Sequence, residues 1–561
     1  MSTRRQALRA LAAAVGAGGA TALAGCQPAE GPGRDANPLA ALLERIGLGR
    51  AGEISGGFVG ASHERGHRLR TGDFSAPGTP RRTTVAIVGG GIAGLSAARQ
   101  LRRAGITDYR LFELEDEVGG NSRAGQVAGV ACPWGAHYLP VPGERAQDLR
   151  ELLQEFGVLK IEAGRPLLDE RVLCHAPQER LLIGGRWQSG LLPLESAATD
   201  DARRFAARVN LERAGGRFGL PSDLAQARGP LAALDRQSFA AWLDDQRLIS
   251  PPLRWYLDYC CRDDYGAPSD QVSAWAGLHY FASRHGFFVP GTDHADPAAD
   301  DVSEVLTWPE GNGWLVTRLA QAHRERIVPS SVVHRVDAQR GAVTLDAWSA
   351  RDNRSERWQA DFVILAVPLF VAARMLVQAP PALSAIVPRL RYASWLVANL
   401  YLPAAPKERP GAARAWDNVI YGGESLGYVD AMHQSLRSAP GATVFTWYQA
   451  LGISHQSRAN LYESSWRDQV ERILADLARA HPDIRQRTRH VDIMRWGHAM
   501  LAPTPGLRSD PAFAELGKPL GRVQLAHSDL AGYSVFEEAF AHGSAAGRWA
   551  AAQVTGRPQR Q

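Results

Sequence analysis

The sequence TVAIVGGGIAG, residues 84–94, decides the fold of this chain. Its first half, residues 84–88, is an apolar and β-branched run of the kind that forms a buried parallel strand. Its second half, residues 89–94, spells G-x-G-x-x-G, and the LSAARQLRRAG that follows has a helical pattern. A strand, a glycine turn and a helix in this order predict the start of a Rossmann-like α/β domain that binds a dinucleotide.

Each glycine of this turn has a separate expected role. Gly89 permits the tight turn, Gly91 lets the backbone approach a pyrophosphate, and Gly94 lets the helix pack on the strand. The helix N-terminus carries unpaired backbone N–H groups that attract negative charge. We therefore expect contacts to the cofactor from Gly89, Gly91, Ile92, Ala93 and Gly94.

A second predicted strand, residues 109–113, ends in an acid. This acid, Glu113, lies 19 residues after Gly94. A carboxylate at this place accepts hydrogen bonds from both hydroxyls of the adenosine ribose. Because the turn and the acid occur together, a glycine turn that binds no ligand is the weaker interpretation.

The residues after Glu113 distinguish flavin from nicotinamide. LEDEVGGNSRAG, residues 114–125, resembles the glycine-glycine motif of FAD-dependent amine oxidases, which share a superfamily with protoporphyrinogen oxidase and phytoene desaturase. The resemblance implies that Gly119, Gly120 and Arg123 lie along the pyrophosphate and flavin of FAD. In the family the arginine usually follows the second glycine directly, whereas here Asn and Ser intervene.

The resemblance returns near the other end of the chain. VQLAHSD, residues 523–529, and the helical pattern after it resemble the closing motif of the family, in which an acid holds the ribityl chain. By this resemblance Asp529 is the ribityl ligand. The backbone N–H groups of Phe536 and Glu537 are expected near flavin N1 and O2, where a helix N-terminus stabilises negative charge. His527 stands where the family usually has glycine, so we expect a different local backbone there.

The resemblance covers most of the chain from residue 83 and implies an α/β fold, with a discontinuous Rossmann-like FAD-binding domain of the GR2 type and an inserted α+β substrate domain. Val333 lies in an alternating strand whose backbone meets adenine in the family, and residues 360–368 form the strand and proline turn expected next. The implied boundaries are 83–165, 303–380 and 490–555 for FAD binding, and 166–302 (helical) and 381–489 (more strand-like) for substrate binding.

Three residues are candidates for the catalytic site by resemblance. His137 lies in a segment that passes close to the flavin ring in the family, and Trp496 and His498 belong to a segment beside it. Many family members have a lysine near flavin N5, where the family transfers a hydride from a C–N or C–C bond. Here Val397 stands nearest to that place, with no lysine within reach. The missing lysine indicates an electron acceptor other than oxygen, such as a quinone.

The resemblance favours an FAD-dependent oxidoreductase of the amine oxidase type that acts on a small molecule. Two alternatives stay open: a carotenoid-desaturase or protoporphyrinogen-like dehydrogenase, and a non-catalytic, flavin-stabilised accessory protein of the cell envelope. A basic amine needs carboxylates and an aromatic cage, for which Asp263, Asp264 and nearby tyrosines are candidates. A polyene or tetrapyrrole needs an apolar tunnel. His279 is expected to be a core histidine rather than a base.

The first 26 residues read as an export signal. Arg4 and Arg5 precede a short apolar region rich in Ala and Gly, which resembles a twin-arginine signal, and LAGC at residues 23–26 resembles a lipoprotein processing box. We therefore expect a periplasmic or outer-surface protein with a lipid anchor at Cys26. The chain of 561 residues has a net charge of +5, which is too small and too dispersed to indicate nucleic acid.

Residues 27–82 are rich in Pro and Gly at both ends, and we interpret them as a linker and lead-in segment. HERGH, residues 63–67, matches the H-E-x-x-H spelling of zinc peptidases. The surrounding glycines argue against a helix, so the segment is expected to be polar surface without a metal site. Cys260 and Cys261 are adjacent and are expected to be buried thiols rather than a disulfide.

Overall fold

The computed structural model describes residues 53–193, 200–223, 227, 229–284, 286–287, 289, 305–433, 435 and 441–556. The predicted export signal, the twin arginines, the lipid-anchor cysteine and the first half of the predicted linker lie outside these residues. In the described part of the chain, no helix combines the length and the apolar character that crossing a membrane requires.

The predicted strand, glycine turn and helix are confirmed as β2, a turn and α4, and β2 is central to a seven-stranded sheet. Strands β12, β3, β2, β15 and β21 are parallel neighbours, while β13 and β14 pair antiparallel at the β15 side. The strands are β2 (Arg81–Val88), β3 (Tyr109–Phe112), β12 (Ile327–Val328), β13 (Ser331–Ala338), β14 (Val343–Ser349), β15 (Arg354–Leu365) and β21 (Val523–Leu525).

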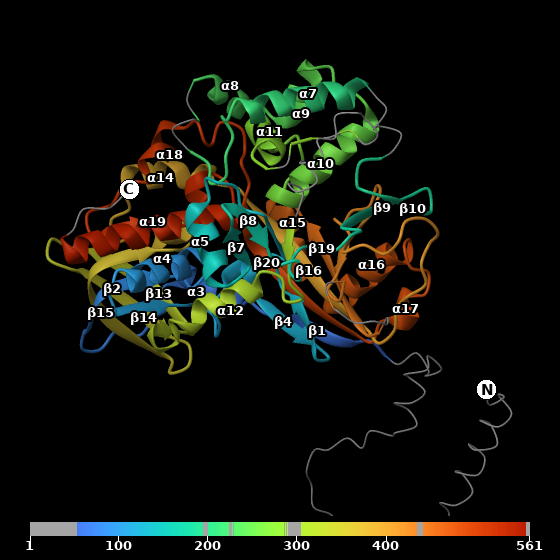
Figure 1. The fold of residues 1–561 in the computed structure, drawn as a ribbon. Coiled ribbons are helices and arrows are strands. Elements are labelled where there is room, and N and C mark those ends of the chain that lie inside the picture. The colour runs from blue at the N-terminus through green and yellow to red at the C-terminus, as the bar shows by residue number, and fades with distance from the viewer. Residues whose placement is uncertain are drawn as a thin grey trace, which may run out of the picture. The chain divides into compact units, whose positions relative to one another are not determined.

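Alternate residues of this sheet enter two separate cores. Val85, Ile87 and Ile364 pack with α4, α5, α12 and α19 on one face, whereas Ala86 and Val363 pack with α13, α14 and α18 on the other. Figure 1 shows α19 lying along α4 over the sheet. The helices are α4 (Ile92–Arg103), α5 (Gln147–Glu155), α12 (Gly313–Gln321), α13 (Leu369–Met375), α14 (Pro381–Ile386), α18 (Pro511–Glu515) and α19 (Phe536–Thr555).

A larger, eight-stranded sheet stands beside the first, in the order β1-β20-β16-β19-β18-β17-β9-β10. The boundary predicted at residue 490 falls at the first residue of β20, which pairs with β16 and β1 in this second sheet, so the chain returns to the first sheet only at β21. The strands are β1 (Ser55–Val59), β9 (Glu179–Ile183), β10 (Arg186–Ser189), β16 (Tyr392–Leu402), β17 (Asp417–Ile420), β18 (Tyr428–Asp430), β19 (Thr443–Ala450) and β20 (His490–Leu501).

Helices cover both faces of this second sheet. Trp395, Val397 and Tyr448 pack with a helical group that Figure 1 shows in green above the sheets, and Leu396 and Leu400 pack with the second group on the opposite face. The first group is α7 (Asp200–Ala214), α8 (Pro230–Arg236), α9 (Phe239–Asp245), α10 (Pro251–Tyr265) and α11 (Ala274–Ala282), and the second is α15 (His455–Glu463), α16 (Trp466–Ala478) and α17 (Ile484–Arg487).

Short strands connect the parts of the chain around the two sheets. They form two hairpins, β4 with β5 and β7 with β8, and one pair between distant segments, β6 with β11. These strands are β4 (Ala124–Val127), β5 (Val130–Pro133), β6 (Tyr138–Pro140), β7 (Leu159–Glu162), β8 (Arg165–Leu168) and β11 (Val305–Thr307).

The H-E-x-x-H segment, predicted to be polar surface without a helix, is a helix, α3 (His63–Thr71), so the expectation against a helix is wrong; none of the helix residues is fully buried. The Ser62 hydroxyl accepts a hydrogen bond from the backbone N–H of Arg65 at its start, and Gly72 ends it in the left-handed conformation. These two caps outweigh the helix-weakening effect of Gly66. A Cβ built at Gly66 would meet no atom within 4 Å. Residues 55–71 of the predicted linker therefore belong to the packed fold.

Candidate active site

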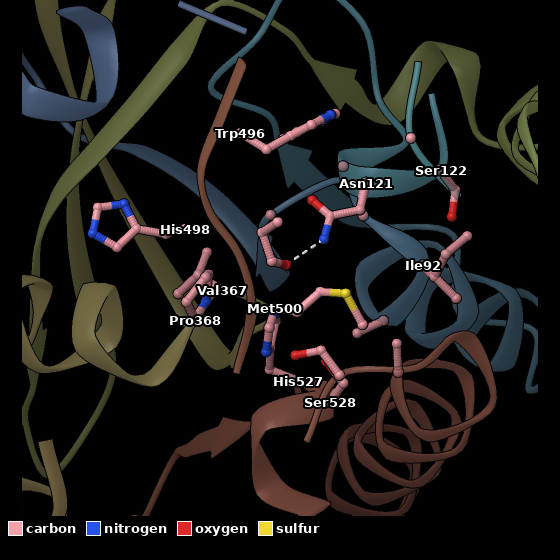
Figure 2. A pocket seen from close by; sticks show the side chains of 18 of the residues that line it. Ile92, Asn121, Ser122, Val367, Pro368, Trp496, His498, Met500, His527 and Ser528 are labelled. Carbon is pink, nitrogen blue, oxygen red and sulfur yellow. Dashed lines mark hydrogen bonds between the residues drawn. The ribbon is translucent and has the colours of Figure 1, made fainter. Parts of the chain in front are cut away.

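A cavity of about 550 Å³ brings the two sequence motifs together. The glycine turn, the end of β3, the closing motif and β20 all contribute to its wall, and Figure 2 shows Ile92, Ser122, Met500 and Ser528 around it. Thirteen of the fifteen predicted site residues line it: Gly89, Gly91, Ile92, Ala93, Glu113, Gly119, Gly120, His137, Val333, Trp496, His498, Asp529 and Phe536.

The two predicted residues that do not line this cavity are Gly94 and Arg123. Gly94 packs where a Cβ would lie 1.9 Å from the carbonyl oxygen of Gly89, in agreement with its expected packing role. Arg123 is buried behind the wall, with its guanidinium 5.5 Å from the ring centre of Trp496. The two extra residues before Arg123 explain the change, because Asn121 and Ser122 occupy the wall instead.

Gly91 is different from the other glycines of the turn. Its φ of −72° suits any residue, and the atom nearest to a Cβ built there is the Cα of Gly120, 4.0 Å away. Gly89, by contrast, has a φ of +102°, and a Cβ there would lie 2.3 Å from the carbonyl oxygen of Ala366. The fold itself therefore requires glycine at 89 but not at 91, where a side chain would fill part of the cavity.

Glu113 is held at the end of β3 by two backbone donors. The N–H groups of Gly90 and Glu115 each donate to one of its carboxylate oxygens over 2.8 Å. Burial raises the pKa of Glu113 to about 6, and these hydrogen bonds oppose the rise. At a pH well above this value the group is mainly ionised and faces the cavity, as an acceptor of ribose hydroxyls must be.

We expect Glu113→Ala to weaken FAD binding by roughly 1 to 3 kcal/mol, because it removes hydrogen bonds to a charged acceptor. Equilibrium dialysis of the apoprotein against FAD measures this loss. Glu117→Ala changes a neighbouring surface acid that does not line the cavity and serves as the control. Equal affinities of the two variants would contradict the assignment of Glu113.

Asp529 provides a second buried carboxylate in the wall. Its Oδ2 accepts from the N–H of Leu369 and from the hydroxyl of Tyr392, whereas its Oδ1 lies 3.1 Å from Nδ1 of His527 and accepts no aligned hydrogen bond. Burial favours a raised pKa for Asp529, but the neighbouring His527 and Tyr392 outweigh burial and lower the pKa. An ionised carboxylate with an oxygen open to further hydrogen bonds fits the hydroxyls of a ribityl chain.

His527 takes the place of the usual glycine with ordinary backbone geometry. Its φ of −149° and ψ of 154° are extended, and its Nδ1 accepts the N–H of Asp529 as the cap of a short helical turn. The departure from the family therefore adds a partner for Asp529 and causes no strain.

The candidate catalytic residues are neutral and lie in different parts of the cavity. Burial lowers the pKa of His137 to about 4, and burial together with the charge of Arg458 lowers that of His498 to about 3. Trp496 is fixed because its Nε1 donates to the carbonyl oxygen of Trp134 over 2.8 Å. Figure 2 shows Trp496 and His498 on opposite sides of β20.

Val397 is buried in β16 and lines the cavity, as the family resemblance predicts. The chain has lysines only at 160, 407 and 518, none of which lines the cavity. His137 and His498 are both uncharged at neutral pH because of their lowered pKa values. Neither histidine therefore replaces the positive charge of the lysine that many family members have near flavin N5.

A second cavity of about 410 Å³ shares part of its wall with the first, including His137, Tyr138 and Tyr448. Four carboxyl groups from four different elements face it. They are Glu179 of β9, Asp263 of α10, Asp417 of β17 and Glu537 of α19.

Burial raises the pKa of all four carboxyl groups. The pKa values of Glu179, Asp263 and Glu537 rise to about 7, and that of Asp417 lies well above its usual range. Among the described residues that line this cavity, Arg284 is the one permanently charged cation, and it pairs with Asp264 over 3.0 Å. The site therefore has an excess of acidic groups over cations.

Aromatic side chains form the rest of this second wall. The hydroxyl of Tyr448 donates to Asp417 over 3.1 Å, and that of Tyr138 donates to Asp263 over 3.4 Å. Sequence reasoning singled out Asp263 and Asp264 but missed Glu179 and Asp417, because nothing in their local sequence shows that their strands meet. The aromatic lining residues include Tyr138, Tyr256, Tyr259, Tyr280, Trp416 and Tyr448.

The expectations for Cys260, Cys261 and His279 are confirmed. Cys260 and Cys261 are free and buried thiols, as expected. His279 is buried in the core, where its Nε2 lies 3.1 Å from the carbonyl oxygen of Gly219. In the described part of the chain, no group of three or more potential ligands for a metal ion occurs, at the H-E-x-x-H segment or elsewhere.

The family described as flavin containing amine oxidoreductase matches residues 92–551. A coproporphyrinogen III oxidase of Mycobacterium tuberculosis is 29% identical over 340 residues, which cover 58% of this chain and 67% of that protein. Wild-type putrescine oxidase bound to putrescine has a TM-score of 0.61 at 19% identity, covering 85% of this chain and 100% of its own. Cyclohexylamine oxidase from Brevibacterium oxydans has a TM-score of 0.60 at 17% identity, covering 84% and 99%. At these identities the solved structures show a shared fold.

Proposed function

Because this chain belongs to the flavin containing amine oxidoreductase family, we propose that it is an FAD-dependent dehydrogenase of cationic amines. Its cofactor is FAD, and it is an oxidoreductase, as the family establishes. The amine substrate, the electron acceptor and the location of the protein are our inference. The family membership disfavours a non-catalytic accessory role.

The excess of buried carboxyl groups in the second cavity carries the proposal. Ionised carboxylates are costly to bury without a cation. Four carboxyl groups share this cavity, and Arg284, the arginine among its described lining residues, is already paired with Asp264. An ammonium group would supply the missing charge. The surrounding tyrosines and Trp416 add aromatic faces to which a cation is attracted.

FAD, when bound, supplies the group that accepts a hydride from the substrate carbon. The protein's residues position that carbon and control the proton. Asp263 lies where both cavities meet, and a carboxyl group with a pKa of about 7 is suited to take up the proton that an ammonium must lose before oxidation. Tyr448 and His137 belong to both walls, with their ring centres 4.9 Å apart, and are placed to position the substrate between the cavities.

A tetrapyrrole substrate is the second candidate, because several mycobacterial relatives are named coproporphyrinogen III oxidase. Coproporphyrinogen carries carboxylate groups. Those of the four carboxyl groups that are ionised, as Glu179, Asp263 and Glu537 mainly are above a pH of about 7, would repel them electrostatically, so we favour the amine. Anaerobic mixing of the flavoprotein with each class of compound, followed by flavin absorbance, tests this choice.

We expect the reduced enzyme to react slowly with oxygen and quickly with a quinone. A cation beside the flavin would favour the negative charge that develops on oxygen, but Val397 is apolar and both nearby histidines are neutral. Stopped-flow mixing of photoreduced protein with air-saturated buffer measures the rate. Val397→Lys is the matched variant and should react faster with oxygen. Reoxidation of the unaltered protein as fast as a true oxidase would contradict the assignment as a dehydrogenase.

We further propose that the protein is exported folded and anchored by lipid at Cys26. Replacing Arg4 and Arg5 by lysines should retain it in the cytoplasm, and Cys26→Ser should release it from membranes. Fractionation of cells followed by detection of the flavoprotein measures both. Unchanged distributions of the two variants would refute the signal.

A further inference from the structure

Helix α3 closes one end of the first cavity and lies outside the matched family residues, which begin at 92. Two contacts attach the start of α3 to the residues that follow β3. The N–H of Ser62 donates to Glu115 over 2.9 Å, and Arg65 pairs with Asp116 over 3.0 Å. Residues three and four apart share one face of a helix, and the residues that line the cavity follow this spacing. They are His63, Gly66, His67 and Arg70, joined by Leu69.

The α3 end of the cavity is electropositive. Arg374 of α13 lines it together with Arg70, and both side chains reach the solvent. Arg458 of α15 is fixed nearby by two backbone carbonyls, those of Tyr392 and Gly497, at 2.7 and 2.6 Å. The charges of Arg458 and Arg70, added to burial, lower the pKa of His498 and hold it in its neutral form. The carboxylates that line this cavity come from the end of β3, from α10, from the closing motif and from α19: Glu113, Asp263, Asp264, Asp529 and Glu537.

The floor between these cations is apolar and aromatic. Phe370 and Val371 of α13 form it with Leu69 of α3 and Met375, and the Phe370 ring centre lies 5.0 Å from that of His498. Val367 and Pro368, which Figure 2 shows on the His498 side of β20, connect this floor to the cofactor-binding wall. The cavity therefore has an apolar slot with a cationic rim at one end and an acidic wall shared with the second cavity at the other.

We propose that the α3 end is the binding site of an aromatic anion that serves as electron acceptor, a quinone that carries an acidic group. The inference rests on the proposed function, since it assigns the second reactant of that same site. In the overall reaction the amine loses a hydride and a proton to become an imine, and the quinone gains both to become a hydroquinone. The opposite charges of the two ends would direct the cationic amine and the anionic acceptor to different parts of the cavity.

The first experiment measures binding to the oxidised, FAD-loaded protein by calorimetry, with 2-naphthalenesulfonate as an aromatic anion and 2-naphthol as its neutral counterpart. The sulfonate should bind at least about tenfold more tightly, and the difference should shrink at high salt. The double variant Arg70→Gln/Arg374→Gln should lose this preference. Arg324→Gln/Arg340→Gln removes the same charge from two exposed sites that do not line the cavity, and it should keep the preference.

The second experiment asks whether the bound anion occupies the acceptor site. Amine-dependent reduction of 2,6-dichlorophenolindophenol, an anionic dye, should be inhibited by the sulfonate in competition with the dye and not with the amine. Equal binding of sulfonate and naphthol, an unchanged preference in the double variant, or inhibition that competes with the amine would each overturn the proposal. Amine binding to the unaltered protein is measured separately, so a failure of the proposed function gives a different result.

Discussion

Replacing Gly91 by valine should give a folded protein without flavin. The backbone at 91 has a conformation that any residue adopts, and the nearest atom to an added Cβ is 4.0 Å away, so the fold tolerates the side chain. The same side chain would occupy the space above the N-terminus of α4, where the pyrophosphate binds. We expect the purified variant to be colourless, with FAD affinity reduced more than about 100-fold by steric exclusion, since even a lost charged hydrogen bond costs about 1.5 to 3 kcal/mol.

Absorbance at the flavin band and far-UV circular dichroism measure the two parts of this prediction. Gly78→Val is the matched control, because Gly78 is exposed, has no neighbour within 4 Å of an added Cβ and lies outside the cavity. A yellow Gly91→Val protein would contradict the cofactor assignment. A variant that fails to fold would contradict the claim that the glycine serves the ligand rather than the fold.

The double variant Asp263→Asn/Asp417→Asn should lose cation binding by at least about 100-fold at a pH above about 7, because two carboxyl groups that can ionise against an ammonium group disappear. Asparagine keeps an oxygen that can accept the hydroxyls of Tyr138 and Tyr448, so the wall is retained. Benzyltrimethylammonium is a suitable probe, since it cannot be oxidised through an N–H bond and has no titratable proton. Calorimetry gives its dissociation constant, and Asp270→Asn/Asp361→Asn, two exposed aspartates outside both cavities, is the control.

The pH dependence of the same binding should follow the carboxyl groups. Burial raises the pKa of Asp263 and Glu179 to about 7, so these groups become protonated and neutral as the pH falls from about 8 to about 6. Affinity for the quaternary ammonium should therefore fall over this window. A constant affinity across it would contradict a cation site built on these groups.

The free energy of unfolding should depend on pH in the opposite sense to cation binding, so it should fall as the pH rises. A carboxyl group whose pKa is higher in the folded than in the unfolded chain makes the folded state less stable as the pH rises between the two values. For Asp263 the unaltered protein has this penalty in full above a pH of about 7, and for Asp417, whose pKa is raised well above its usual range, the penalty grows further as the pH rises; the Asp263→Asn/Asp417→Asn variant has neither. We expect the variant to have a higher Tm at a pH of about 8 and a smaller gain or none at about 5, as measured by calorimetry. A lower Tm of the variant at the higher pH would indicate that the two acids stabilise the fold.

The cofactor wall could be predicted from the sequence because local patterns specify it. The glycine turn, the acid after β3 and the closing motif each depend on a few consecutive residues whose backbone roles are general. Arg123 does not line the cavity, because two inserted residues place Asn121 and Ser122 in the wall, and an insertion cannot be resolved without side-chain packing. Helix α3 was missed because the capping by Ser62 and Gly72 outweighed the glycine within it.

The substrate wall could not be predicted in the same way. Glu179 and Asp417 face one cavity because β9 pairs with β17, and that pairing joins strands separated by more than two hundred residues. No local sequence pattern predicts such a contact. The excess of carboxyl groups over cationic side chains at the site is visible only when the four elements are assembled. The electropositive α3 end has the same origin, since Arg70, Arg374 and Arg458 come from three separate helices.

Oxidation of a cationic amine by the bound flavin is tested most directly by anaerobic mixing of the FAD-loaded protein with such an amine and, separately, with coproporphyrinogen, while flavin absorbance is recorded. An amine should bleach the flavin and the porphyrinogen should not, and the bleaching should be lost in Asp263→Asn/Asp417→Asn. Bleaching by the porphyrinogen and by none of a panel of primary, secondary and aromatic amines would contradict the assignment as an amine dehydrogenase.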